Sequence, residues 1–85
     1  MFNQYWETTY EGHNINIKNS WFGATELYVN KKLQDKSINF FNGKLMGKII
    51  TKEKEINLRI IVTATLFSVE CIIFADNILI YSSKK

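Results

Sequence analysis

The stretch from Ile56 to Tyr81 constrains the fold of this chain more than any other part of the sequence. It reads INLRIIVTATLFSVECIIFADNILIY and is the longest run rich in β-branched and apolar residues, which favour strands. Turn-forming residues interrupt it at residues 63–68 and 75–77. We therefore expect three consecutive antiparallel strands here, and we expect them to supply much of the hydrophobic core.

Shorter strand patterns fill the rest of the chain, and helical periodicity is hard to find. Residues 13–20 place Ile15 and Ile17 on one face and polar residues on the other, as in a strand with one buried face. The clearest alternation runs from Ile56 to Thr65. Further strands are expected at residues 2–10, 25–30, 33–35, 40–51, 69–74 and 78–81, with turn signals at Glu11-Gly12, Asn30-Lys31-Lys32, Lys52–Glu55 and Asp76-Asn77.

Seven or eight short strands without a helix predict an all-β fold. We expect a compact antiparallel β-sandwich, with a small closed β-barrel as the alternative. The 85 residues fit one domain, residues 1–85, whose tail at residues 82–85 is expected to fray. Residues 35–39 are expected to form a loop. The strand of residues 40–51 contains two glycines, so we expect it to bend strongly and to pass from one sheet to the other.

The net charge of +3 comes from the middle of the chain, where residues 31–54 carry seven lysines against two acidic residues. Lys44 and Lys48 share one face of a strand, while Lys31 and Lys32 fall at a turn. These four lysines are the candidate contacts if the chain is a basic small-barrel nucleic-acid-binding protein. Arginine, which leads base and phosphate contacts, occurs once, so nucleic acid is the less favoured partner.

Catalytic and metal-binding chemistry finds little support in the sequence. The one cysteine, Cys71, lies in an apolar strand pattern, and the one histidine, His13, is fifty-eight positions away. Alternation along its strand places Glu70 on the side away from the core, which favours a solvent-facing side chain over a catalytic acid. We therefore expect no enzyme activity, no cofactor and no metal.

The location of the protein is inferred from features that the sequence lacks. One cysteine allows no internal disulfide, which fits a reduced compartment. No export signal and no apolar run long enough to span a membrane are present. We expect a cytoplasmic protein that does not contact a membrane, and its many Asn, Ile and Lys residues suggest an AT-rich bacterial genome.

The order of motifs resembles the repeat domain of the Fas apoptosis inhibitory molecule family over nearly the whole chain. The residues that carry the resemblance are Trp6-Glu7, Glu11-Gly12-His13 with Ile15-Asn-Ile17, Gly23, Leu27–Asn30, Phe41–Ile49 and Phe67–Asn77. Lys31 and Asn77 stand where hairpins of the family usually have glycine, and one domain replaces the usual two. The resemblance implies a compact antiparallel β-sandwich without enzymatic activity, acting in protein interaction or in protection of other proteins from aggregation.

Two sets of apolar residues are candidate contacts. Trp21 and Phe22 fall at a loop beside Gly23, where they either contact a ligand or cap the end of the sandwich. If Val69, Cys71 and Ile73 face the core, the residues with the opposite parity must face outward. These are Ile61, Ile72 and Phe74, and together they would form an apolar patch on a face that should be wet.

Three explanations of this patch remain open. A bulge near Ile72 could reverse the parity of the strand, or a long loop could cover the face. Otherwise the patch is an association surface, most simply for a twofold homodimer. The sequence thus favours a non-enzymatic β-sandwich protein-interaction module that self-associates, with the nucleic-acid-binding protein as the alternative.

Overall fold

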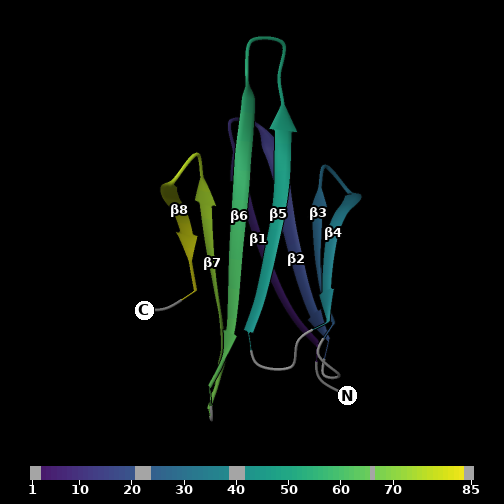
Figure 1. Ribbon diagram of the computed structural model, residues 1–85, viewed down its shortest axis with the longest axis vertical. Helices are drawn as coiled ribbons and strands as arrows, with labels where there is room; N and C mark the ends of the chain where they lie inside the picture. Colours follow the sequence, from purple (N-terminus) through teal and green to yellow (C-terminus); the bar gives the residue numbers. More distant parts are fainter. Residues whose placement is uncertain (1–2, 21–23, 39–41, 66, 84–85) are drawn as a thin grey trace.

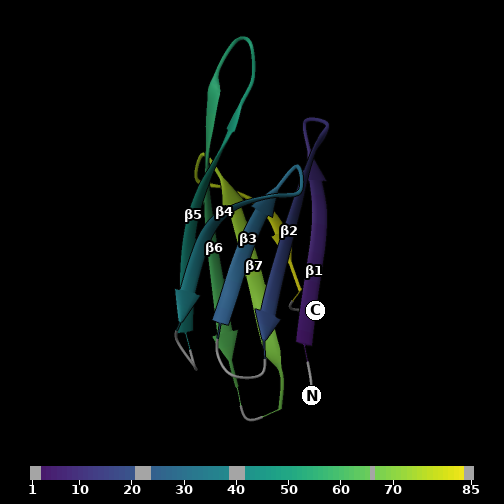
Figure 2. The ribbon, with the colours of Figure 1, turned by 90° about the vertical axis from the view of Figure 1, so that its right-hand side faces the viewer.

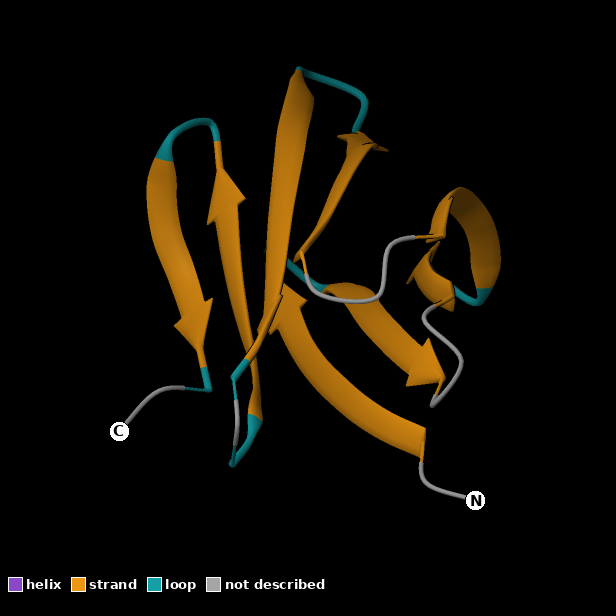
Figure 3. Ribbon diagram, turned by 60° about the horizontal axis from the view of Figure 1, so that its bottom comes forward, coloured by secondary structure: helices purple, strands orange, loops and turns teal. Residues whose placement is uncertain are grey.

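The computed structural model describes residues 3–20, 24–38, 42–65 and 67–83. These residues form eight strands joined by short connections, and none of them is helical (Figures 1 and 3). The strands are β1 (Asn3–Tyr10), β2 (His13–Ser20), β3 (Ala24–Val29), β4 (Lys32–Ile38), β5 (Asn42–Ile50), β6 (Glu55–Ala64), β7 (Val69–Ala75) and β8 (Ile78–Ser82).

The strands form two antiparallel four-stranded sheets, each a meander of consecutive strands. One sheet has the order β1-β2-β3-β4 and the other the order β5-β6-β7-β8. The sheets pack face to face as two layers, and the β5–β6 hairpin extends beyond the other hairpins (Figures 1 and 2). The predicted β-sandwich is confirmed. The closed barrel is wrong for the described strands, because main-chain pairing stops at the neighbouring edges of β4 and β5.

Three hairpins turn in two residues that both have positive φ angles. This left-handed conformation matches the twist of the flanking strands, and it favours Gly, Asn and Asp. The three predicted turns are confirmed at Glu11 (φ 48°) and Gly12 (80°), Asn30 (51°) and Lys31 (70°), and Asp76 (48°) and Asn77 (67°).

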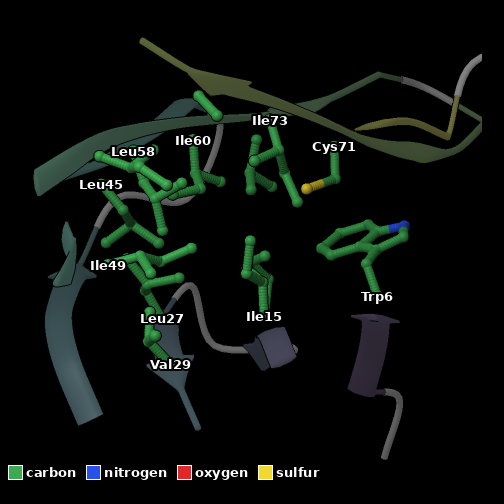
Figure 4. Close-up of a cluster of buried hydrophobic side chains, with 14 residues drawn as sticks. Trp6, Ile15, Leu27, Val29, Leu45, Ile49, Leu58, Ile60, Cys71 and Ile73 are labelled. Carbon is green, nitrogen blue, oxygen red and sulfur yellow. The ribbon is translucent and has the colours of Figure 1, made fainter. Parts of the chain in front are cut away.

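The core is built by alternate residues from both sheets. Each fully buried Ile or Leu side chain stabilises the fold by roughly 1.5–3 kcal/mol. Figure 4 shows Trp6 of β1 pointing toward Cys71 of β7 across the layer between the sheets. The buried apolar residues are Trp6, Ile15, Ile17, Leu27, Val29, Leu45, Ile49, Ile56, Leu58, Ile60, Val62, Cys71, Ile73 and Ala75.

Side chains from β4 close the seam between the two sheets. The Asp35 carboxylate accepts a hydrogen bond from the main-chain N–H of Met46 at 2.9 Å, and Gln34 hydrogen-bonds the main chain of Lys48. The loop expected at residues 35–39 is wrong for residues 35–38, which belong to β4, and residue 39 lies outside the described residues. Its polar residues belong to an edge strand, and the pairing with β3 shifts register at Leu27/Tyr28.

The expectation that residues 40–51 pass between the sheets is also wrong for the described part of that segment. β5 pairs along its length with β6 alone, and Gly47 serves a close approach instead. A Cβ at Gly47 would lie 2.5 Å from Oε1 of Gln34 and 2.6 Å from Cδ2 of Leu27. Glycine at this position allows β3 and β4 to pack tightly against β5.

Ser82 and Ser83, at the start of the C-terminal tail, are bonded to the rest of the fold. Ser82 belongs to β8, and Ser83 donates its main-chain N–H to the carbonyl oxygen of Cys71 at 2.9 Å. The Ser83 hydroxyl accepts a hydrogen bond from the N–H of Cys71 at 2.7 Å. Residues 84–85 lie outside the described part of the chain, and the fraying expected at residues 82–85 stays a prediction.

Candidate interaction face

The three residues expected to face outward lie together on the solvent side of the β5–β8 sheet. Ile61 of β6 is directly opposite Ile72 of β7, and Phe74 lies two residues further along β7. The residues that alternate with them, among them Ile60, Cys71 and Ile73, are buried. The β6–β7 pairing has no register shift between the Leu58–Ala75 pair and the Ala64–Val69 pair. The expected bulge near Ile72 that would reverse the parity of the strand is therefore wrong.

Two more apolar side chains extend the patch across the sheet. Met46 of β5 pairs with Arg59, and Leu79 of β8 pairs with Phe74, which places the four residues in one cross-strand row. Met46 is 69% exposed and Leu79 is 55% exposed, while Ile61, Ile72 and Phe74 are half-buried. We call Met46, Ile61, Ile72, Phe74 and Leu79 the apolar face.

The sequence contained a signal for Met46 but not for Leu79. Met46 lies midway between Lys44 and Lys48, so it shares their outward parity on β5. The β7–β8 pairing instead shifts register between Ile73 and Phe74, and this bulge decides which β8 residue stands beside Phe74. Alternation alone does not predict such a shift.

Charged residues border the apolar face. The guanidinium carbon of Arg59 lies 4.8 Å from the centroid of the Phe74 ring, a cation–π contact that holds the arginine over the face. Glu70 pairs with Thr63 and Lys44 pairs with Ile61 on the same side of the sheet. Within the described part of the chain, neither Arg59 nor Glu70 forms an ion pair.

A shallow depression of about 300 Å³ adjoins the Arg59 end of this face. The Asp76 carboxylate in its lining already accepts the N–H of Asn57 at 2.9 Å. The depression is therefore lined by apolar and amide groups together with the arginine and this hydrogen-bonded carboxylate. Its lining residues are Met46, Asn57, Leu58, Arg59, Asp76 and Asn77.

The outer face of the β1–β4 sheet carries several polar side chains that are linked by hydrogen bonds. The Asn14 amide donates to the Glu7 carboxylate at 2.7 Å, and the Tyr28 hydroxyl donates to the Glu26 carboxylate at 3.1 Å. The bond to Glu26 raises the pKa of Tyr28 above its usual value. Several polar groups of this face are thus bonded within the chain, and Tyr5 is exposed on the same sheet.

The four candidate lysines for nucleic acid lie on two different elements. Lys31 and Lys32 lie at the β3–β4 hairpin, whereas Lys44 and Lys48 lie on the outer face of β5. Lys48 is 3.4 Å from the Glu55 carboxylate. Two further lysines of the basic segment are also paired, Lys36 with Glu26 at 4.0 Å and Lys54 with Glu11 at 3.0 Å; the contact with Glu11 raises the pKa of Lys54.

The remaining candidate residues are Cys71, His13, Trp21 and Phe22. Burial raises the pKa of the Cys71 thiol from 9.0 to about 12, so the thiolate is scarce at neutral pH. His13 Nδ1 lies 2.9 Å from the side-chain nitrogen of Asn30. Among the described residues, no group of three or more His, Cys, Asp or Glu side chains could hold a metal ion. Trp21 and Phe22 lie outside the described residues.

No described segment is a helix with the length and apolarity needed to cross a membrane. Comparison of the chain with protein-family models, with curated proteins and with solved structures finds no match. The resemblance to the Fas apoptosis inhibitory molecule repeat domain therefore stays a prediction.

Proposed function

We propose that this chain is a non-enzymatic protein-interaction module that associates with a second copy of itself through the apolar face. The observation that carries the proposal is the position of Ile61, Ile72 and Phe74, which share the solvent side of two adjacent central strands. The solvent side of an antiparallel sheet normally carries polar residues. Contiguous apolar side chains there are typical of a surface that a partner covers.

The arrangement also matches the anatomy of a protein interface. Apolar side chains make up most of the face, Lys44 and Glu70 stand at its border, and Arg59 lies between Met46 and Phe74 with its guanidinium over the Phe74 ring. Interface cores are depleted in charge, whereas their rims are polar. Each square ångström of apolar surface removed from water contributes about 25 cal/mol, so covering these side chains favours association.

A second copy is the simplest occupant of such a face. Most soluble oligomers are symmetric, and a twofold contact uses the same patch on both subunits. The resemblance to the Fas apoptosis inhibitory molecule repeat domain, which implies interaction without catalysis, supports the same class of function.

Sedimentation velocity over a range of concentrations tests the proposal. The parent chain should sediment above its 10.0 kDa monomer mass as concentration rises. Phe74→Glu should sediment as a monomer, because it places a charge in the centre of the contact. Tyr5→Glu is the matched control: Tyr5 is 63% exposed on the opposite sheet, so this variant should associate like the parent.

Circular dichroism of the three proteins shows whether each one is folded. A parent chain that stays monomeric at every concentration, or a Phe74→Glu variant that associates as strongly as the parent, would overturn the proposal.

A further inference from the structure

Arg59 and Glu70 occupy diagonally opposite positions around the centre of the apolar face. Ile61 and Ile72 form a directly opposed pair on β6 and β7. Arg59 lies two residues from Ile61, at the level of Phe74, while Glu70 lies two residues from Ile72, at the level of Thr63. Because the two strands are antiparallel, the positive and negative side chains lie on opposite sides of the isoleucine pair.

This placement makes the face complementary to itself in one particular orientation. Consider a twofold axis that lies in the interface and crosses the strands at the level of Ile61 and Ile72. The rotation stacks the isoleucine pair of one copy on that of the other and reverses the strand direction, so Arg59 of each copy comes to the level of Glu70 of the other, on the neighbouring strand. Each arginine then meets the glutamate of the second copy, and the contact occurs twice.

We infer that two copies stack their apolar faces about this axis, with Arg59 of each copy forming an ion pair with Glu70 of the other. The inference rests on the proposed function and adds the orientation and the polar contacts of the dimer. The strands of the two copies run in opposite directions across the interface. Sheets packed face to face keep their strand directions within about 30° of parallel or antiparallel alignment, which this arrangement allows.

The charges exclude the other simple orientation. A twofold axis parallel to the strands would place Arg59 against Phe74 of the second copy and Glu70 against Thr63 of the second copy. Both charges would then be covered without an opposite charge, and an unpaired buried charge opposes association. The crossing axis instead pairs two residues that form no ion pair within the described part of their own chain.

Two structural details favour the same contact. The Phe74 ring already holds the Arg59 guanidinium over the face, which lowers the entropy lost when the arginine binds a carboxylate. Lys44, the other charge at the level of the isoleucines, belongs to the edge strand β5. It therefore lies at the rim, where water and salt screen its repulsion from Lys44 of the second copy.

Charge reversal provides the test. Arg59→Glu alone and Glu70→Arg alone should each weaken self-association by about tenfold or more, since each homodimer would carry two like-charged contacts. An equimolar mixture of the two variants should regain association close to that of the parent, because both contacts in the mixed dimer again join opposite charges. Sedimentation velocity and native mass spectrometry measure the mixed dimer directly.

Lys44→Glu mixed with Glu70→Arg is the matched control, and this mixture should show no such recovery. If the Arg59→Glu and Glu70→Arg mixture fails to associate while Phe74→Glu still abolishes the parent dimer, the orientation inferred here is wrong and the proposed function stands. If the parent itself does not associate, the proposed function fails and this inference fails with it.

Discussion

The side-chain amide of Gln34 forms two hydrogen bonds with the main chain of Lys48. Its Nε2 donates to the Lys48 carbonyl oxygen at 2.9 Å, and its Oε1 accepts from the Lys48 N–H at 2.8 Å. One side chain of β4 thereby supplies the bonds that a neighbouring strand would give to β5. Asp35 continues this pattern at Met46, so side chains protect the edge of β5 along the seam.

Gln34→Ala should lower the free energy of unfolding by about 1–2 kcal/mol, because it removes both hydrogen bonds to Lys48. Urea denaturation measures the change. Leu33→Ala is the control: Leu33 precedes Gln34 in β4 and is 52% exposed, so its truncation should change stability by only about 0.5 kcal/mol. Equal losses in the two variants would show that the amide contacts contribute nothing specific.

Gly47→Ala should cost about 1–3 kcal/mol, since the new methyl group would overlap Gln34 and Leu27. Thermal and urea unfolding measure the loss. Gly43→Ala, at the other glycine of β5, is the control. The nearest atom to its new methyl group would be Oγ1 of Thr25 at 3.4 Å, so the loss of stability should be clearly smaller. A Gly43→Ala variant that is the less stable of the two would contradict this account of the seam.

The contribution of Cys71 to stability should depend on pH. Below about pH 9 the thiol is neutral in both states; above it the unfolded chain ionises, while the folded pKa is about 12. The unfolded state is then favoured, and the contribution falls by up to about 1.4 kcal/mol per pH unit until the folded thiol also ionises. Cys71→Ala should be less stable than the parent near neutral pH, and the difference should shrink as the pH rises.

Urea titrations of both proteins between about pH 8 and pH 11 measure this difference, and the comparison cancels the titration of the tyrosines and lysines. A difference that does not change with pH would count against the raised pKa.

Nucleic acid should not bind tightly. The candidate lysines are divided between a hairpin and the outer face of β5, and Lys48 is already paired with Glu55. A retardation assay with single-stranded and duplex DNA and RNA should show no shift at moderate salt. Affinity that falls steeply with salt concentration, and that Lys44→Gln weakens, would instead support the nucleic-acid-binding alternative.

Much of the fold follows from local sequence patterns. Glu11-Gly12 and Asp76-Asn77 are short pairs that adopt the left-handed conformation, and each lies between two alternating segments. The alternation itself identified the buried residues Ile15 and Ile60 and the outward position of Ile72. Parity is a local property, so the centre of the apolar face could be predicted without knowing the sheet order.

The features that the sequence did not predict depend on contacts between distant residues. The full length of β4 depends on side chains that reach β5, such as Asp35 on Met46. The role of Gly47 depends on Leu27 and Gln34, which are brought near it by the packing of the two sheets. Leu79 joins the apolar face because of a register shift, which has no periodic signature.

The division of the chain into two meanders has a consequence for folding kinetics. Every described strand pairs only with strands next to it in sequence. Each sheet can therefore form by successive hairpin pairing, and closing the short loops between the strands costs little entropy. Contacts between the two halves of the chain arise where one sheet meets the other, and Trp6 and Cys71 are buried together in this core. We expect hairpins to form early in each half, and the docking of the two halves, not the pairing of strands, to set the rate of folding.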